Sequence, residues 1–343
     1  MPITIHDVAR LSGVSVATVS RAFGRPASVR LETREAILRA AEQVGYRPNR
    51  AARGLMTGKT GNVGVIVPDL ANPFFPSVLK GVQARAREAD YACFLADSGE
   101  DPCVELELIR DMANQVDGVV LCSSRMSRAD LASVTRLTTV VLMNRREAAI
   151  PAVLMDSADG ARQAIDHLAA LGHRRIAFLA GPRSSWSNRE RQRGLRAAAK
   201  ATGVEITELG PFAPQFADGQ RAADDVASAD VTAVLAYNDL MALGVISRLS
   251  DHGISTPGDI SVVGFDDIPV ASMCTPSLTT VSMPTEASGR RAVELLLEQL
   301  SGADPVNPTP QRRLPTQLVI RASSGPPRSA RRRTSARSEV LAP

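Results

Sequence analysis

Residues 4–21 read TIHDVARLSGVSVATVSR, and this stretch predicts two short amphipathic helices joined by a tight turn. Thr4 is a good helix N-cap, and Asp7, three residues later, can complete a capping box. Gly13 supplies the permissive backbone that so short a turn requires, and Ser15 caps the chain again. The pattern is that of a helix-turn-helix unit.

A third amphipathic segment follows and is expected to form a helix from about Thr33 to Val44. Four apolar residues share one face of it, namely Ile37, Leu38, Ala41 and Val44. The sequence Gly45-Tyr46-Arg47-Pro48 should end this helix, because glycine favours the C-terminal cap and proline cannot continue a helix. Three short helices can close one small core, so residues 1–48 are predicted to be an all-α helix-turn-helix domain.

The charge of the chain is strongly polarised. Residues 1–60 hold ten basic and four acidic side chains, a net charge of +6, and the segment from Ser323 onward has a net charge of +4. The region between them has a net charge of −6, because the whole chain carries only +4. A basic head on an acidic body is typical of a protein that binds nucleic acid through one part of its surface.

The head resembles that of the lactose-repressor (LacI) family of bacterial transcription regulators. The segments that carry the resemblance are Thr4 to Arg21, Thr33-Arg34 and Gly45-Tyr46-Arg47-Pro48-Asn49, and the similarity continues to about residue 322. It implies a cytoplasmic, ligand-regulated transcription factor, most often a repressor, that binds a near-palindromic operator in double-stranded DNA. One departure is Arg30, where the family usually has a serine that caps the third helix, so the helix is expected to start at Thr33.

The resemblance and the geometry of the motif agree on which residues read DNA. The first turn of the second helix would enter the major groove. Val16 and Ala17 can contact thymine methyl groups but cannot make bidentate hydrogen bonds, so Arg21 is expected to carry much of the direct readout. The residues assigned to DNA are Thr4, Ser15, Val16, Ala17, Thr18, Ser20 and Arg21 in the head, with Asn49, Arg53 and Leu55 beyond it.

Residues 49–60 are predicted to be a hinge helix and linker, with Asn49 as its cap and Gly58 as its stop. The helix would be shorter than the roughly 12 to 15 residues at which an isolated helix becomes marginal in water. The resemblance implies that it folds on the operator and that Leu55 wedges into the minor groove and kinks the DNA. The alternative is a flexible linker.

From Asn62 onward, short apolar runs alternate with helical stretches such as 74–89 and 160–171. The runs read as buried strands at Val63–Val67, Ala92–Ala96, Gly118–Cys122, Val140–Met143, Ile176–Ala180, Ala233–Ala236 and Ser261–Phe265. This pattern predicts an α/β body over residues 61–322, made of two doubly wound lobes with a cleft at the carboxyl ends of the strands. No secretory or membrane-spanning segment is expected.

The body resembles the two-lobed periplasmic sugar-binding fold, and five motifs that each follow a predicted strand carry this match. They are Asp69-Leu70-Ala71-Asn72-Pro73-Phe74-Phe75, Asn144-Arg145, Trp186-Ser187-Asn188-Arg189, Tyr237-Asn238-Asp239 and Gly264-Phe265-Asp266-Asp267. The resemblance implies an effector site in the cleft. Phe74, Trp186 and Phe216 would stack on an apolar face of the effector. The residues expected to bind its polar groups are Asn72, Asn144, Arg145, Arg189, Asn238 and Asp266.

The charge of these residues favours an anionic effector. Arg145 and Arg189 against Asp266 would give the cleft about +1, which suits a sugar acid or a sugar phosphate as well as a sugar. Glu190 or Asp267 would cancel this preference if either turned inward. A nucleobase or a partner protein is the alternative effector.

Other functions have weaker support in the sequence. A solute-binding receptor is disfavoured by the basic head and by the missing signal peptide, and an enzyme by the lack of a catalytic set of residues. Cys93, Cys103, Cys122 and Cys274 show no metal-ligand spacing, so we expect no metal or cofactor and buried free thiols in a reducing cytoplasm. Residues 323–343 are predicted to be a disordered basic tail. They lack leucine heptads for tetramerisation, so a homodimer is favoured.

Overall fold

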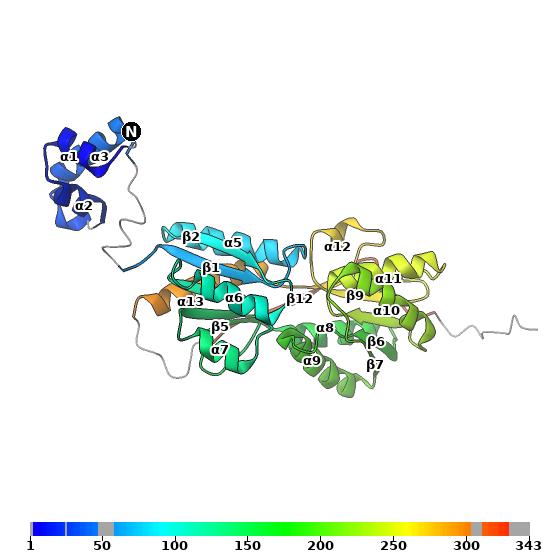
Figure 1. Ribbon diagram of the computed structural model, residues 1–343. Helices are drawn as coiled ribbons and strands as arrows, with labels where there is room; N and C mark the ends of the chain where they lie inside the picture. Colours follow the sequence, from blue (N-terminus) through cyan, green and yellow to red (C-terminus); the bar gives the residue numbers. More distant parts are fainter. Residues whose placement is uncertain (1–2, 25, 47–57, 303–310, 329–343) are drawn as a thin grey trace, which may run out of the picture.

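A computed structural model describes residues 3–24, 26–46, 58–302 and 311–328 (Figure 1). The described residues form a helical head and two α/β lobes. This architecture confirms the fold class predicted from the sequence. Among the described residues, no helix is both long and apolar enough to cross a membrane.

The head has three α-helices, α1 (Ile5–Ser12), α2 (Val16–Gly24) and α3 (Leu31–Val44), with a 3₁₀ turn at Pro26–Ser28. Gly13 ends α1 with a φ of 66°, in the left-handed region that favours glycine, so the tight turn forms without strain. The small core consists of Val8, Ala9, Val19, Ala22, Ile37, Ala40 and Ala41.

The start of α3 differs from the prediction. The helix begins at Leu31, two residues before Thr33, and Arg30 is its N-cap without a side-chain hydrogen bond. The Arg30 carbonyl already accepts the first helical bond from the Arg34 N–H at 3.0 Å. A helix end at the surface needs no side-chain cap, because water can satisfy its free N–H groups.

The first lobe is a six-stranded sheet in the order β11-β5-β4-β3-β1-β2, and all its pairs are parallel. Its strands are β1 (Asn62–Val67), β2 (Ala92–Asp97), β3 (Gly118–Cys122), β4 (Thr139–Met143), β5 (Ala152–Met155) and β11 (Gln311–Leu314). Helices α5 (Phe74–Glu88) and α13 (Thr285–Leu300) pack on one face, and α6 (Pro102–Met112) and α7 (Arg128–Val134) pack on the other.

The second lobe is also a six-stranded sheet, in the order β12-β10-β9-β8-β6-β7, with only β12 antiparallel to its neighbour. Its strands are β6 (Arg175–Leu179), β7 (Glu205–Leu209), β8 (Ala233–Ala236), β9 (Ser261–Asp266), β10 (Thr279–Ser282) and β12 (Gln317–Val319). Helices α8 (Ser157–Ala170) and α9 (Trp186–Thr202) pair with each other, as do α10 (Phe216–Ser228) and α11 (Asp239–Asp251); the short α12 spans Val270–Met273.

The described chain passes between the lobes after β5, after β10 and after β11 (Figure 1). The carboxyl ends of the parallel strands of both sheets therefore meet at the boundary between the lobes. In open α/β sheets this is the edge at which ligands bind.

The C-terminal boundary predicted for the body is wrong. Residues 323–328 pack against the second lobe, and Ser323 is fully buried. The Ser323 hydroxyl donates to the Val262 carbonyl at 2.6 Å, and the His173 Nε2 lies 2.9 Å from the Gly325 carbonyl. The polar side chains that suggested disorder instead form hydrogen bonds with the amino-terminal ends of β9 and β10. Residues 329–343 lie outside the described residues.

The cysteines also differ in part from the expectation. Cys122 is buried, Cys93 and Cys274 are half-buried, and Cys103 is exposed on α6. All four are free thiols. Within the described ranges, no group of histidine, cysteine and acidic side chains is arranged to hold a metal ion.

Candidate effector pocket and DNA-binding surface

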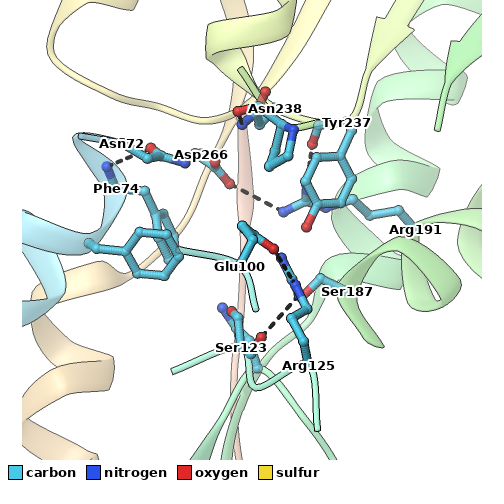
Figure 2. A pocket seen from close by; sticks show the side chains of 13 residues that line it. Asn72, Phe74, Glu100, Ser123, Arg125, Ser187, Arg191, Tyr237, Asn238 and Asp266 are labelled. Atoms are coloured by element: carbon cyan, nitrogen blue, oxygen red, sulfur yellow. Dashed lines mark hydrogen bonds and ion pairs between the residues drawn. The ribbon is translucent and has the colours of Figure 1, made fainter. Parts of the chain in front are cut away.

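A polar pocket lies between the lobes, at the ends of their strands (Figure 2). The first lobe contributes the start of α5 and the loops after β1, β2, β3 and β4, and the second lobe contributes α9, the loop after β7 and the ends of β8 and β9. The lining consists of Asn72, Phe74, Phe75, Glu100, Ser123, Arg125, Asn144, Ser187, Arg191, Pro214, Tyr237, Asn238 and Asp266.

Unusual backbone conformations are concentrated around this pocket. Six non-glycine residues in the described chain have a positive φ, and four of them line the pocket: Glu100 (64°), Ser123 (50°), Asn144 (50°) and Asp266 (116°). Such conformations cost about 1–3 kcal/mol each and persist where the surrounding structure enforces them. Here they turn the chain sharply at the strand ends and direct these side chains towards the cleft.

Arg191 and Asp266 form the charged centre of the second lobe. A terminal nitrogen of Arg191 lies 3.2 Å from the Asp266 carboxylate, another donates to the Tyr237 carbonyl, and both side chains are almost fully buried. The guanidinium also lies over the ring of Phe265, 3.8 Å from its centre. Burial raises the pKa of Asp266 to about 6, although Arg191 opposes this shift. The buried Nε of Arg191 has no hydrogen-bond partner among the described residues.

A second buried carboxylate, that of Asp239, lies near Asp266 and does not line the pocket. Asp239, at the start of α11, accepts hydrogen bonds from the Thr280 hydroxyl at 2.5 Å and from the Ile268 N–H at 2.8 Å. Burial raises its pKa well above the usual value, and the nearby Asp266 raises it further. Asp239 thereby fixes the turn that follows β9 and holds Asp266 in place.

The first lobe contributes a second ion pair, between Glu100 and Arg125. The Nε of Arg125 and one terminal nitrogen contact the two carboxylate oxygens of Glu100 at 2.5 and 3.0 Å. The Glu105 carboxylate accepts the backbone N–H of Arg125 at 3.0 Å. Burial lowers the pKa of Arg125, but its contacts with Tyr237 and Glu100 outweigh burial and raise the pKa above its usual range.

The asparagines differ in how far their polar atoms are already used. The side-chain oxygens of Asn72 and Asn144 accept backbone N–H groups, from Phe74 at 3.0 Å and from Met155 at 3.4 Å. Asn238 uses both atoms within the protein, since it donates to the Pro214 carbonyl at 2.8 Å and caps α11. Asn238 therefore shapes the pocket. The bonds of Asn72 and Asn144 use only the side-chain oxygens and leave the amide N–H groups out.

Five of the nine residues predicted for the effector line this pocket: Asn72, Phe74, Asn144, Asn238 and Asp266. The other four do not. Arg145 is buried and donates to the carbonyls of Ser124 and Met126. Arg189 is exposed and donates to the carbonyls of Arg183 and Ser184. Trp186 packs against the apolar cluster of the first lobe, and Phe216 is 41% exposed.

The charge of this pocket therefore differs from the +1 that the sequence led us to expect. The arginines at the pocket are Arg125 and Arg191, and each is paired with a carboxylate, so the formal charge of the lining is zero. Sequence reasoning missed Arg191, because the sequence alone does not show which face of α9 meets the pocket. Ser187 and Arg191 are four residues apart on α9 and share one helical face, whereas Arg189 lies on another face.

The N-terminal end of α2 forms a small exposed surface on the head. Ser15, Ala17 and Arg21 are exposed, whereas Val16 is half-buried against the core of the head. The Ser15 hydroxyl caps the helix by accepting the Thr18 N–H at 3.2 Å. Arg21 contacts the Ala17 carbonyl and the Thr18 hydroxyl at 3.3 and 3.4 Å.

The other residues predicted to contact DNA lie on the head or outside the described residues. Thr18 and Ser20 on α2 are half-buried, and Thr4 is exposed. Both the backbone N–H and the hydroxyl of Thr4 donate to the Asp7 carboxylate at 2.9 Å. Asn49, Arg53 and Leu55 of the predicted hinge lie outside the described residues.

Comparison with known proteins identifies both parts of the chain. The lacI family of bacterial regulatory proteins matches residues 4–49, and a periplasmic binding protein-like domain matches residues 165–324. The HTH-type transcriptional regulator GalS of Salmonella typhimurium (strain LT2) is 34% identical over 311 residues, which cover 88% of this chain and 91% of GalS. The chain belongs to the LacI family.

Solved structures of other transcriptional regulators have the same architecture. The lac repressor dimer bound to operator and the anti-inducer ONPF superposes with a TM-score of 0.84 at 27% identity, covering 95% of this chain and all of the other. The complex of the transcriptional regulator CelR with cellobiose gives a TM-score of 0.69 at 32% identity, covering 94% and 100%. Like other LacI-family members, the protein is a DNA-binding, ligand-responsive transcriptional regulator.

Proposed function

We propose that this LacI-family protein is a repressor that binds a near-palindromic operator as a homodimer, and that a neutral sugar bound between its lobes controls its operator affinity. The lac repressor, which shares its fold over nearly the whole chain, is a repressor and a dimer on its operator. The effector class rests on the pocket, and the operator contacts rest on the exposed face of α2.

The observation that carries the effector class is the internal pairing of every charge at the pocket. Arg191 is matched by Asp266 and Arg125 by Glu100, so an anionic effector would have to compete with a carboxylate of the protein for either arginine. This argues against the sugar acid or sugar phosphate that the sequence favoured. A sugar remains well suited, because its hydroxyl groups both donate and accept hydrogen bonds.

The other groups at the pocket match a sugar as well. The amide N–H groups of Asn72 and Asn144 and the Nε of Arg191 can donate, and the second carboxylate oxygen of Asp266 can accept. The ring of Phe74 offers an apolar surface for the face of a pyranose. CelR, a relative of the same fold, forms a complex with cellobiose.

The size of the pocket indicates how an effector acts. Its volume is about 30 Å³, whereas small-molecule sites commonly measure about 300–1,000 Å³. A sugar therefore requires the lobes to separate or the side chains between them to move. A ligand that favours one arrangement of the lobes shifts the population towards it and can change operator affinity in this way.

A thermal-shift screen followed by DNA binding tests the proposal. The screen compares neutral sugars, their acids, their phosphates and nucleobases, and the operator is selected from random DNA with the full-length protein. We expect a neutral sugar to raise the melting temperature most and to change operator affinity. Stabilisation by nucleobases alone, or by no sugar, would refute the proposed effector class.

A further inference from the structure

We infer that Glu100 is a charge filter, which occupies the anion-binding fork of Arg125 and so restricts the pocket to neutral effectors. The inference rests on the proposed effector function of this pocket and adds a residue that determines specificity. In Figure 2 the Glu100 carboxylate points directly at the guanidinium of Arg125 within the ring of lining residues.

The geometry of the pair is that of a bound carboxylate. Two adjacent nitrogens of the planar guanidinium, Nε and one terminal nitrogen, each contact one oxygen of Glu100, at 2.5 and 3.0 Å. This bidentate arrangement is the one by which arginine recognises carboxylates and phosphates. Glu100 thus occupies the place that the acid group of an anionic ligand would take.

The rest of Arg125 is fixed by other contacts and would stay in place without Glu100. Its remaining terminal nitrogen donates to the Ser123 carbonyl at 3.0 Å, and its backbone N–H donates to the buried Glu105 carboxylate at 3.0 Å. Arg125 also contacts Tyr237 across the cleft. Its side chain is only 4% exposed, so a guanidinium without Glu100 would be a preformed cation in a poorly hydrated site.

The two carboxylates at the pocket are not equivalent. Asp266 is 8% exposed and is held from behind by the α11 and β9 framework. The Glu100 side chain is 23% exposed and projects from the loop between β2 and α6, with a φ of 64°. Glu100 is therefore the carboxylate that a substitution can remove with the least disturbance of the lobe.

Two other ionisable side chains near Arg125 do not replace Glu100. Behind the loop, Glu105 accepts the Arg125 N–H, and Arg145 donates to the carbonyls of Ser124 and Met126. Both side chains are directed to the loop backbone, and neither lines the pocket. Loss of the Glu100 charge should therefore leave the lining with a net charge of +1, centred on Arg125.

The Glu100→Gln variant tests the filter, because glutamine keeps the shape of the side chain and removes its charge. The full-length protein is titrated calorimetrically, without DNA, with glucuronate and galacturonate and with the matched neutral sugars glucose and galactose. We expect Glu100→Gln to bind at least one of the two acids about tenfold more tightly than the wild type does. Glu100→Ala, which also opens space, should show the same gain.

Two further variants show where the gain arises. In Glu100→Gln/Arg125→Met the cation is gone, so the affinity for acids should return to the wild-type level. Glu88→Gln removes the carboxylate partner of Arg290 on the outer surface and should leave the affinity for acids unchanged. Acid affinities in folded Glu100→Gln and Glu100→Ala that match the wild type would overturn the inference, as would a gain that persists without Arg125.

These outcomes are separate from those of the proposed function. A gain of acid binding in the Glu100 variants supports the filter even if no neutral sugar binds the wild type, and that second result would refute only the proposed effector. Conversely, a neutral sugar could control operator binding while the Glu100 variants gain nothing. In that case the filter fails and the proposed function stands.

Discussion

The guanidinium of Arg191 lies 3.2 Å from the carboxylate of Asp266, over the ring of Phe265 and in contact with the Tyr237 carbonyl. One arginine thus joins α9 to the ends of β8 and β9. Because the pair is buried at the pocket, a ligand that bonds to either side chain also acts on the three elements that hold it.

Arg191→Met should abolish the effect of the effector on operator affinity, while operator binding without effector stays within about threefold, since the head is untouched. Removal of one partner of a buried ion pair should also lower the free energy of unfolding by about 3–5 kcal/mol. Fluorescence anisotropy with labelled operator and chemical denaturation measure the two effects.

Arg189→Met is the matched control, because Arg189 is exposed and bonds only to nearby carbonyls in the described structure. It should respond to effector as the wild type does and change stability by less than about 0.5 kcal/mol. A normal response in Arg191→Met together with a lost response in Arg189→Met would show that the wrong arginine has been placed at the effector.

Effector affinity should fall as the solution becomes more acidic than about pH 6. The pKa of Asp266 is raised to about 6, and a sugar hydroxyl that donates to Asp266 prefers the ionised carboxylate. Protonation then competes with binding, so the affinity should drop by up to about tenfold per pH unit below that pKa. Calorimetric titrations between about pH 5 and pH 7.5 measure this. The Asp266→Asn variant should bind the effector more weakly at neutral pH, and its affinity should hardly change with pH. An equally steep decline of affinity in this variant would assign the titration to another group.

Arg21→Ala should weaken specific operator binding by about 1–3 kcal/mol and affect non-specific binding much less. Arg21 is exposed on α2, one turn after the exposed Ala17, so it can reach a base edge. Competition between operator and random DNA measures both affinities. Equal losses on the two DNAs would assign Arg21 to a phosphate.

Gly289→Ala should destabilise the first lobe although alanine is the better helix former. A β-carbon at Gly289 would overlap the Val78 carbonyl where α13 crosses α5. The gain in helix propensity is about 1 kcal/mol, whereas overpacking against a backbone typically costs about 1–3 kcal/mol. Ala287 is exposed on the same helix, so Ala287→Gly should lower the free energy of unfolding by about 1 kcal/mol through helix propensity alone. A higher melting temperature for Gly289→Ala would show that the helices separate easily.

Much of the fold follows from periodicity alone. All seven predicted strands form, within one residue at each end. Six of them are apolar runs that are buried on both faces of a parallel sheet, whereas β2 is an edge strand whose Phe94 and Leu95 are exposed. Most of the strands that were not predicted lack this signal. The edge strand β7 (EITEL) mixes charged and apolar residues, and β10, β11 and β12 are short and contain polar residues. The exception is β5, a buried apolar run of four residues that the prediction missed.

The site was only partly predictable because its details depend on how helices are rotated. Residues at the end of a strand or directly after it, such as Asp266 and Asn144, are placed at the cleft by topology, and the sequence predicted their position at the pocket. Arg189 and Arg191 differ by two positions on a helix, which turns them to different faces, and the sequence does not state which face meets the cleft. Glu100 and Arg125 lie in loops, where no hydrophobic periodicity indicates the direction in which a side chain points.

The operator affinity of the wild-type dimer, measured with and without a saturating neutral sugar from the thermal-shift screen, tests the central claim most directly. Coupling between effector and operator sites is typically about 1–3 kcal/mol, so we predict a change in the operator Kd of at least about fivefold. The same titration of Arg191→Met should show no change. An unchanged operator Kd in the wild type, at a sugar concentration that saturates the pocket, would contradict the account.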